Sequence, residues 1–133
     1  MRTVLIVDDS RPIAMILARH LSGAGYGVRL AHDGAAALEQ LARQVPDCIL
    51  LDLMMPVMTG IELLHRLRET PAYARVPIVL VSARVGEGRT HYLTERDADH
   101  SVGKPFTRQQ VLAAVEAALR EPADCPGGVF AVA

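Results

Sequence analysis

Residues 48–52 read Cys-Ile-Leu-Leu-Asp, a run of four apolar residues followed directly by an acid. Two further stretches carry a comparable apolar tetrad, residues 4–7 (Val-Leu-Ile-Val) and residues 78–81 (Ile-Val-Leu-Val). A strand has such a continuous run when helices cover both faces of its sheet. The three stretches therefore predict the central strands of a parallel sheet.

Two weaker stretches complete the pattern. Residues 28–31 (Val-Arg-Leu-Ala) contain a charge, and residues 100–103 (His-Ser-Val-Gly) are more polar still. Because an edge strand has one side partly in contact with water, we expect these two at the edges of the sheet. The alternation of strands and helices predicts an α/β protein with a doubly wound, five-stranded parallel sheet and helices on both faces.

The segments between the strands carry helix start and stop signals. The predicted starts are an N-cap at Ser10 with Pro12 in the first turn, an N-cap at Asp33, and two capping boxes, Thr59 with Glu62 and Thr107 with Gln110. The first helix should end at residues 22–25 (Ser-Gly-Ala-Gly) and the second at Arg43. Residues 85–96 should form the fourth of five helices, which Gly86 and Gly88 weaken by roughly 1 kcal/mol each relative to Ala.

Composition limits the function classes. The 133 residues are 50% hydrophobic and 22% charged, with a formal net charge of −1. Such a chain suits one folded domain and excludes intrinsic disorder. A near-neutral charge gives no long-range attraction to nucleic acid or anionic lipid, and no apolar run approaches a membrane span. We therefore expect no direct binding to nucleic acid and no membrane insertion.

The domain is expected to cover residues 1–120, and residues 121–133, which contain Pro and Gly, to form a C-terminal tail. The four apolar residues before Asp8 are too few for a signal peptide. Cys48 and Cys125 have no metal or disulfide spacing, so a reducing cytoplasm is the expected compartment.

Polar side chains follow the predicted strands where the strands end. Asp8 and Asp9 follow the first strand, Asp52 the third, Ser82 the fourth and Lys104 the fifth. In an open parallel sheet, ligands bind outside the carboxyl ends of the strands. We therefore expect three acids, one hydroxyl and one amine to converge there.

Three carboxylates in one shallow crevice would repel one another unless a cation lay among them. An all-oxygen donor set with no nearby His or Cys favours Mg²⁺ over Zn²⁺. Mg²⁺ and an ammonium group can neutralise a transferring phosphoryl group, a hydroxyl can donate to it, and a carboxylate can accept it covalently. The pattern thus points to phosphoryl transfer.

Each residue alone also has a simpler interpretation. Asp8 and Asp9 could cap the first helix, Asp52 could be a turn residue, and Ser82 and Lys104 could be surface groups. Their joint occurrence favours the site. The histidines, at positions 20, 32, 65, 91 and 100, have no ligand spacing and are read as surface or core residues.

Four motifs in order resemble the receiver domain of bacterial two-component response regulators. They are residues 7–9 (Val-Asp-Asp), residues 51–56 (Leu-Asp-Leu-Met-Met-Pro) with Gly60, residues 81–83 (Val-Ser-Ala) and residues 104–106 (Lys-Pro-Phe). The resemblance covers about residues 2–120 and implies a flavodoxin-like fold with strand order 2-1-3-4-5. It also implies a signalling protein rather than a conventional enzyme.

The resemblance implies a role for each site residue. Asp52 would accept a phosphoryl group from a histidine kinase or a His-containing phosphotransfer protein. Asp9, Asp52 and the Met54 backbone carbonyl would bind Mg²⁺ directly, with Asp8 holding it through water. Lys104 would bind the phosphoryl oxygens, and Ser82 would move toward them as part of the conformational switch.

Two positions depart from the family pattern: Ser101 stands where receivers usually carry an aromatic residue, and Asp97 where they usually carry glycine. The implied partners are the phosphodonor and a downstream protein, and the implied state is a monomer or a weak dimer through the fourth helix, fifth strand and fifth helix. We expect the chain to act alone.

Two other functions stay open. One is a degenerate receiver that is never phosphorylated. The other is a phosphohydrolase of the haloacid dehalogenase type, which would need Asp-x-Asp where this chain has Asp8-Asp9-Ser10.

Overall fold

The computed structural model describes residues 2–52, 60–82, 100–103 and 106–120. In chain order the elements are β1 (Thr3–Val7), α1 (Arg11–Gly23), β2 (Gly27–Ala31), α2 (Gly34–Arg43), β3 (Cys48–Asp52), α3 (Gly60–Glu69), β4 (Ile78–Ser82), β5 (His100–Gly103) and α4 (Arg108–Arg120). The predicted helix over residues 85–96, the cap at Thr59 and the tail over 121–133 lie outside the described residues.

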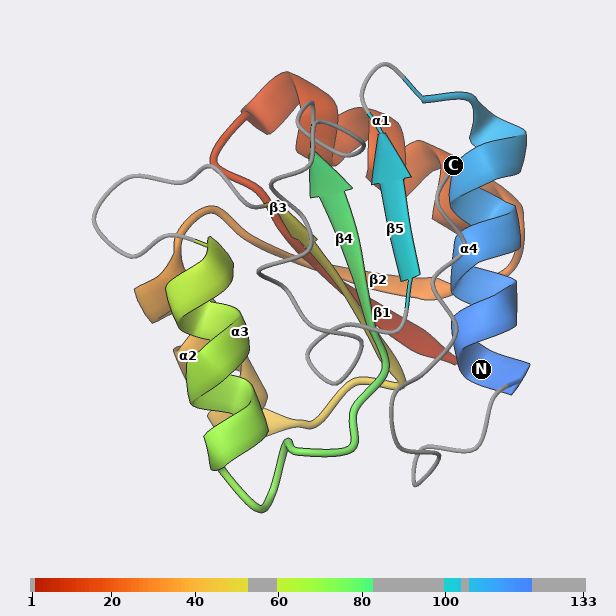
Figure 1. The fold of residues 1–133 in the computed structure, drawn as a ribbon. Coiled ribbons are helices and arrows are strands. Elements are labelled where there is room, and N and C mark those ends of the chain that lie inside the picture. Colours follow the sequence, from red (N-terminus) through yellow and green to blue (C-terminus); the bar gives the residue numbers. More distant parts are fainter. Residues whose placement is uncertain (1, 53–59, 83–99, 104–105, 121–133) are drawn as a thin grey trace.

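The five strands form one parallel sheet with the order β2-β1-β3-β4-β5. Strands β1, β3 and β4 are central and β2 and β5 lie at the edges, as the apolar tetrads and the two weaker stretches predicted. The sheet has α2 and α3 on one face and α1 and α4 on the other (Figure 1). The predicted fold class is confirmed.

Each face of the sheet has its own hydrophobic core, because successive side chains of a strand point to opposite faces. On β1, Leu5 and Val7 pack with α2 and α3, whereas Val4 and Ile6 pack with α1 and α4. All four are at most 1% exposed. Burial of one such side chain contributes about 1.5 to 3 kcal/mol, so the alternating apolar residues of the central strands hold both helical layers.

The predicted caps within the described residues are confirmed. The Ser10 hydroxyl accepts a hydrogen bond from the Ile13 N–H at 3.4 Å, and Asp33 Oδ1 accepts from the Ala36 N–H at 2.7 Å. Thr107 and Gln110 form the reciprocal bonds of a capping box, at 2.8 Å and 3.1 Å. These bonds satisfy N–H groups that the first turn of a helix leaves without a partner.

The end of α1 lies where the sequence predicted it, within residues 22–25. The helix continues to Gly23, and Gly25 then adopts a φ of 97°. That left-handed conformation is readily available only to glycine. Gly25 thereby turns the chain toward the edge strand β2.

No helix of the described residues is long and apolar enough to cross a bilayer.

Candidate metal and phosphoacceptor site

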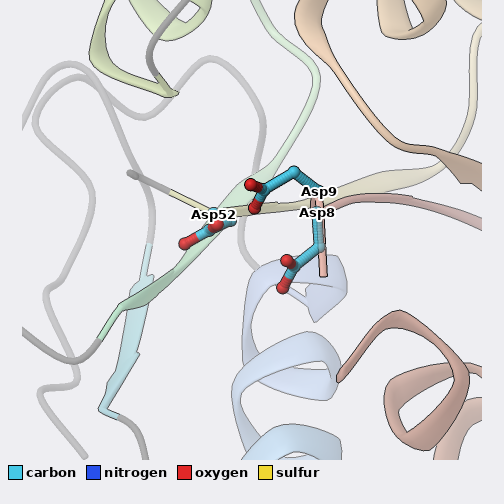
Figure 2. A group of neighbouring side chains, drawn as sticks. All are labelled: Asp8, Asp9 and Asp52. Carbon is cyan, nitrogen blue, oxygen red and sulfur yellow. The ribbon is translucent and has the colours of Figure 1, made fainter. Parts of the chain in front are cut away.

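Sheet register brings together acids that are distant in the sequence. Val7 of β1 pairs with Leu51 of β3, so the next residues, Asp8 and Asp52, lie side by side at the carboxyl ends of neighbouring strands. Asp9 follows directly. One carboxylate oxygen from each acid lies within 4.8 Å of the others (Figure 2). The predicted convergence of the three acids is confirmed.

The three acids differ in their exposure to water. Asp8 is 1% exposed and Asp52 is 4% exposed, and they are the buried charged residues among the described parts of the chain. Asp9 is exposed. Burial of a charge is costly unless other groups compensate it. Two buried carboxylates at the carboxyl ends of neighbouring strands therefore indicate a site built to hold positive charge.

Asp8 is fixed by hydrogen bonds at its backbone and its side chain. Its N–H donates to the Ala31 carbonyl at 3.0 Å, which extends the pairing of β1 with β2 by one residue. Its Oδ1 accepts from the Ser10 N–H at 2.9 Å. The simpler interpretation of Asp8 as a helix-capping residue is thus partly right, since the carboxylate supports the chain where α1 begins, although the N-cap is Ser10.

The donor set of this cluster fits a hard divalent cation. All three groups are carboxylates, and together they carry three formal negative charges in a space that a metal ion and its waters could occupy. Oxygen ligands, two of them on a rigid sheet edge and one exposed to water, suit Mg²⁺, which retains several of its own water ligands. The residues present therefore fit the ion that the sequence predicted.

The remaining predicted residues are placed only in part. Ser82 is the last residue of β4, and its backbone lies one position beyond Val81, the partner of Asp52. This register puts the fourth strand end beside the acidic cluster. Lys104 and Met54 lie outside the described residues.

Sequence reasoning missed one residue of this region. The sequence pattern assigns His32 only a surface or core position, but its Nδ1 lies 3.1 Å from the Asp8 carbonyl oxygen. The two residues are 24 positions apart in the chain. The sequence did contain one signal for this role: His32 directly follows a predicted strand, as Asp8 and Asp52 do, so it lies at the same end of the sheet as the acids.

Comparisons with known proteins agree with this geometry. The family model described as "Response regulator receiver domain" matches residues 4–116. Response regulator MprA of Mycobacterium ulcerans is 40% identical over 117 residues, which cover 88% of this chain and 50% of MprA. The MprA protein of Mycobacterium leprae is also 40% identical over 117 residues. This chain thus spans about half the length of these relatives.

Solved structures give the same result. The chemotaxis response regulator CheY4 of Vibrio cholerae superposes with a TM-score of 0.84 at 32% identity, covering 90% of this chain and 99% of CheY4. The receiver domain of NtrX from Brucella abortus superposes with a TM-score of 0.83 at 26% identity, again covering 90% of this chain and 99% of that domain. Sequence motifs, sheet order and these matches agree, and the chain belongs to the response regulator receiver domain family.

Proposed function

We propose that this chain accepts a phosphoryl group on Asp52 from a histidine kinase or a His-containing phosphotransfer protein, in a Mg²⁺-dependent reaction. The observation that carries the proposal is the three-carboxylate cluster, in which Asp52 ends the central strand β3 beside Asp8 and Asp9. We further propose that the reaction takes place in the cytoplasm.

The transfer requires one bond to form and one to break. An Asp52 carboxylate oxygen attacks the phosphorus of the phosphohistidine, the P–N bond breaks, and the donor imidazole leaves and takes up a proton. Mg²⁺, when bound, would neutralise charge on the phosphoryl oxygens. Asp9, Asp52 and the Met54 carbonyl would hold it directly and Asp8 through water.

The other two site residues would contact the transferred group. Lys104 would bind a phosphoryl oxygen through its ammonium, and Ser82 would donate a hydrogen bond to another. Because the group ends on the protein's own Asp52, the chain is proposed as a signalling protein with intrinsic phosphorylation and dephosphorylation chemistry and no external substrate.

The test is phosphorylation by acetyl phosphate with Mg²⁺, measured by intact mass. Wild type should gain the mass of one phosphoryl group, and EDTA should prevent the gain. Asp52→Asn should gain nothing because an amide cannot form the acyl phosphate. Asp47→Asn is the matched control, since Asp47 is an exposed acid just before the same strand and accepts a hydrogen bond from the Thr3 N–H. A wild type that stays unlabelled would favour the degenerate receiver.

The helix beside the site offers a surface for the phosphodonor. Met15 is 54% exposed and Ile16 is 43% exposed on α1, which begins two residues after Asp9. Arg11 and Arg19 are exposed on the same helix, and its first turn has no acidic residue. We propose that an amphipathic helix with acidic flanks, carrying the donor histidine, packs on these side chains.

Small and protein donors should respond differently to changes on α1. Met15→Glu should slow phosphotransfer from a phosphorylated His-containing domain and leave labelling by acetyl phosphate unchanged. Val45→Glu is the control, because Val45 is 46% exposed but lies before β3, at the opposite end of that strand from Asp52. Equal phosphotransfer rates in both variants would reject α1 as the docking surface.

The output is proposed to be a conformational switch read by a downstream protein. Since Ser101 replaces the usual aromatic residue, we expect Ser82 to transmit the signal to residues 84–96, which lie outside the described residues. Beryllofluoride should alter amide protection there in wild type but much less in Ser82→Ala.

We also propose a monomer or weak dimer through residues 85–96, β5 and α4, which sedimentation with and without beryllofluoride would test.

A further inference from the structure

His32 is the first residue after strand β2. Main-chain pairing of β1 with β2 ends at Val7 and Ala31. Beyond that pair, the Asp8 N–H still reaches the Ala31 carbonyl at 3.0 Å, and the Asp8 carbonyl meets the His32 ring at 3.1 Å. Ala31, the last residue of β2, thus binds the N–H of Asp8, and His32 contacts its carbonyl.

The contact bears directly on the acidic cluster. The Asp8 carbonyl belongs to the peptide unit that joins Asp8 to Asp9. Because a peptide unit is planar, a hydrogen bond to this carbonyl restrains the rotation of the whole unit. That rotation sets the direction in which the Asp9 backbone leaves β1. Asp9 is exposed, so neighbouring side chains restrain it less than they restrain the buried Asp8.

The contact requires a particular tautomer of the His32 imidazole. A carbonyl oxygen only accepts hydrogen bonds, so His32 Nδ1 must carry a hydrogen in order to donate to Asp8. An asparagine at this position could place its amide N–H₂ where Nδ1 lies, whereas an alanine could donate nothing. This difference gives the contact a matched pair of variants.

We propose that His32 is a positioning residue for the metal site: its Nδ1–H donates to the Asp8 carbonyl and holds the Asp8–Asp9 peptide in the orientation that binds Mg²⁺. The proposal rests on the function proposed above and names a residue that regulates the affinity of the same site. His32 does not touch the ion. It acts on the backbone that carries two of the three carboxylates, as outer residues of metal sites orient the ligands.

The experiment is calorimetric titration of the full chain with Mg²⁺ alone. His32→Ala should weaken Mg²⁺ binding roughly tenfold, within the range seen when residues that orient metal ligands are removed. His32→Asn should restore most of the affinity, because its amide can replace the lost donor. His65→Ala is the control, since His65 is exposed on α3 and is not one of the residues of the cluster. Melting in EDTA separates these effects from loss of the fold.

A second readout examines the hydrogen bond itself. Long-range ¹⁵N–¹H spectra of the imidazole should show a protonated Nδ1 in wild type, and the Asp9 amide resonance should shift in His32→Ala more than in His32→Asn. A ring that carries its hydrogen only on Nε2 would overturn the proposal. So would unchanged Mg²⁺ affinity in His32→Ala, or the same loss of affinity in both His32 variants.

Wild type and His32→Ala together show whether the role of His32 or the metal site itself is wrong. If wild type binds Mg²⁺ and is labelled by acetyl phosphate but His32→Ala behaves identically, only the role of His32 is rejected. If wild type binds no Mg²⁺ at all, both proposals are rejected.

Discussion

Replacement of Asp9 by Asn should stabilise the metal-free protein. Asp9 has a carboxylate oxygen within 4.8 Å of oxygens of both Asp8 and Asp52. Two like charges at this distance repel by about 1 kcal/mol in water and about 3.5 kcal/mol at an effective dielectric constant of 20. Asp9 is exposed, so the aqueous value applies, and two pairs give about 1 to 2 kcal/mol in total. For a chain of this size that is roughly 3 to 8 °C in melting temperature.

Mg²⁺ should reverse the order of the two proteins. A ligand at 100 times its Kd stabilises the folded state by about 2.7 kcal/mol, which exceeds the gain from removing one charge. Wild type should therefore melt above Asp9→Asn at a Mg²⁺ concentration that is about 100 times the wild-type Kd and still below the Kd of the variant, and it should melt below the variant in EDTA. Scanning calorimetry with and without the ion measures both differences.

Glu39→Gln is the control for this experiment, because it removes the same charge from an exposed position on α2. Glu39 pairs with Arg43 at 3.6 Å, and both side chains are 73% exposed, so its loss should change stability by only a few tenths of a kcal/mol. If Asp9→Asn melts at or below wild type in EDTA, the three carboxylates do not repel in the folded state and the reasoning is refuted.

Three further changes test the site and the fold. Asp9→Asn should weaken Mg²⁺ binding more than Asp8→Asn does, since Asp9 is proposed as the direct ligand, and equal affinities by calorimetry would contradict these roles. Burial raises the pKa of the Tyr26 phenol above its usual 10.0, and nearby Glu116 raises it further. The folded state therefore binds the phenol proton more tightly than the unfolded state does. This difference stabilises the fold fully below pH 10.0, and the stabilisation is lost as pH rises through the pKa of the folded state. Tyr26→Phe should therefore flatten the fall of melting temperature with pH above pH 10.0. Asp33→Ala should cost about 1 kcal/mol by removing the N-cap of α2, whereas Asp33→Asn should cost little, as chemical denaturation would show.

The sequence by itself determined where the described strands and capped helix starts lie. The apolar tetrads predicted β1, β3 and β4 because a strand covered on both faces excludes polar residues, and the caps at Ser10 and Asp33 were predicted because their bonds span only three residues. The identity of the acids was also available, since Asp8 and Asp52 directly follow apolar runs and Asp9 is next to Asp8. Such signals are local, so no tertiary contact was needed to find them.

Only the tertiary structure decided how the acids differ and what supports them. Parallel strands pair through residues far apart in the chain, and the register of β1 with β3 places Asp8 beside Asp52, where both are buried while Asp9 is exposed. The contact between His32 and Asp8 likewise depends on β2 lying beside β1. No pattern within either segment encodes these pairings, because packing of the helices on both faces fixes the sheet as a whole.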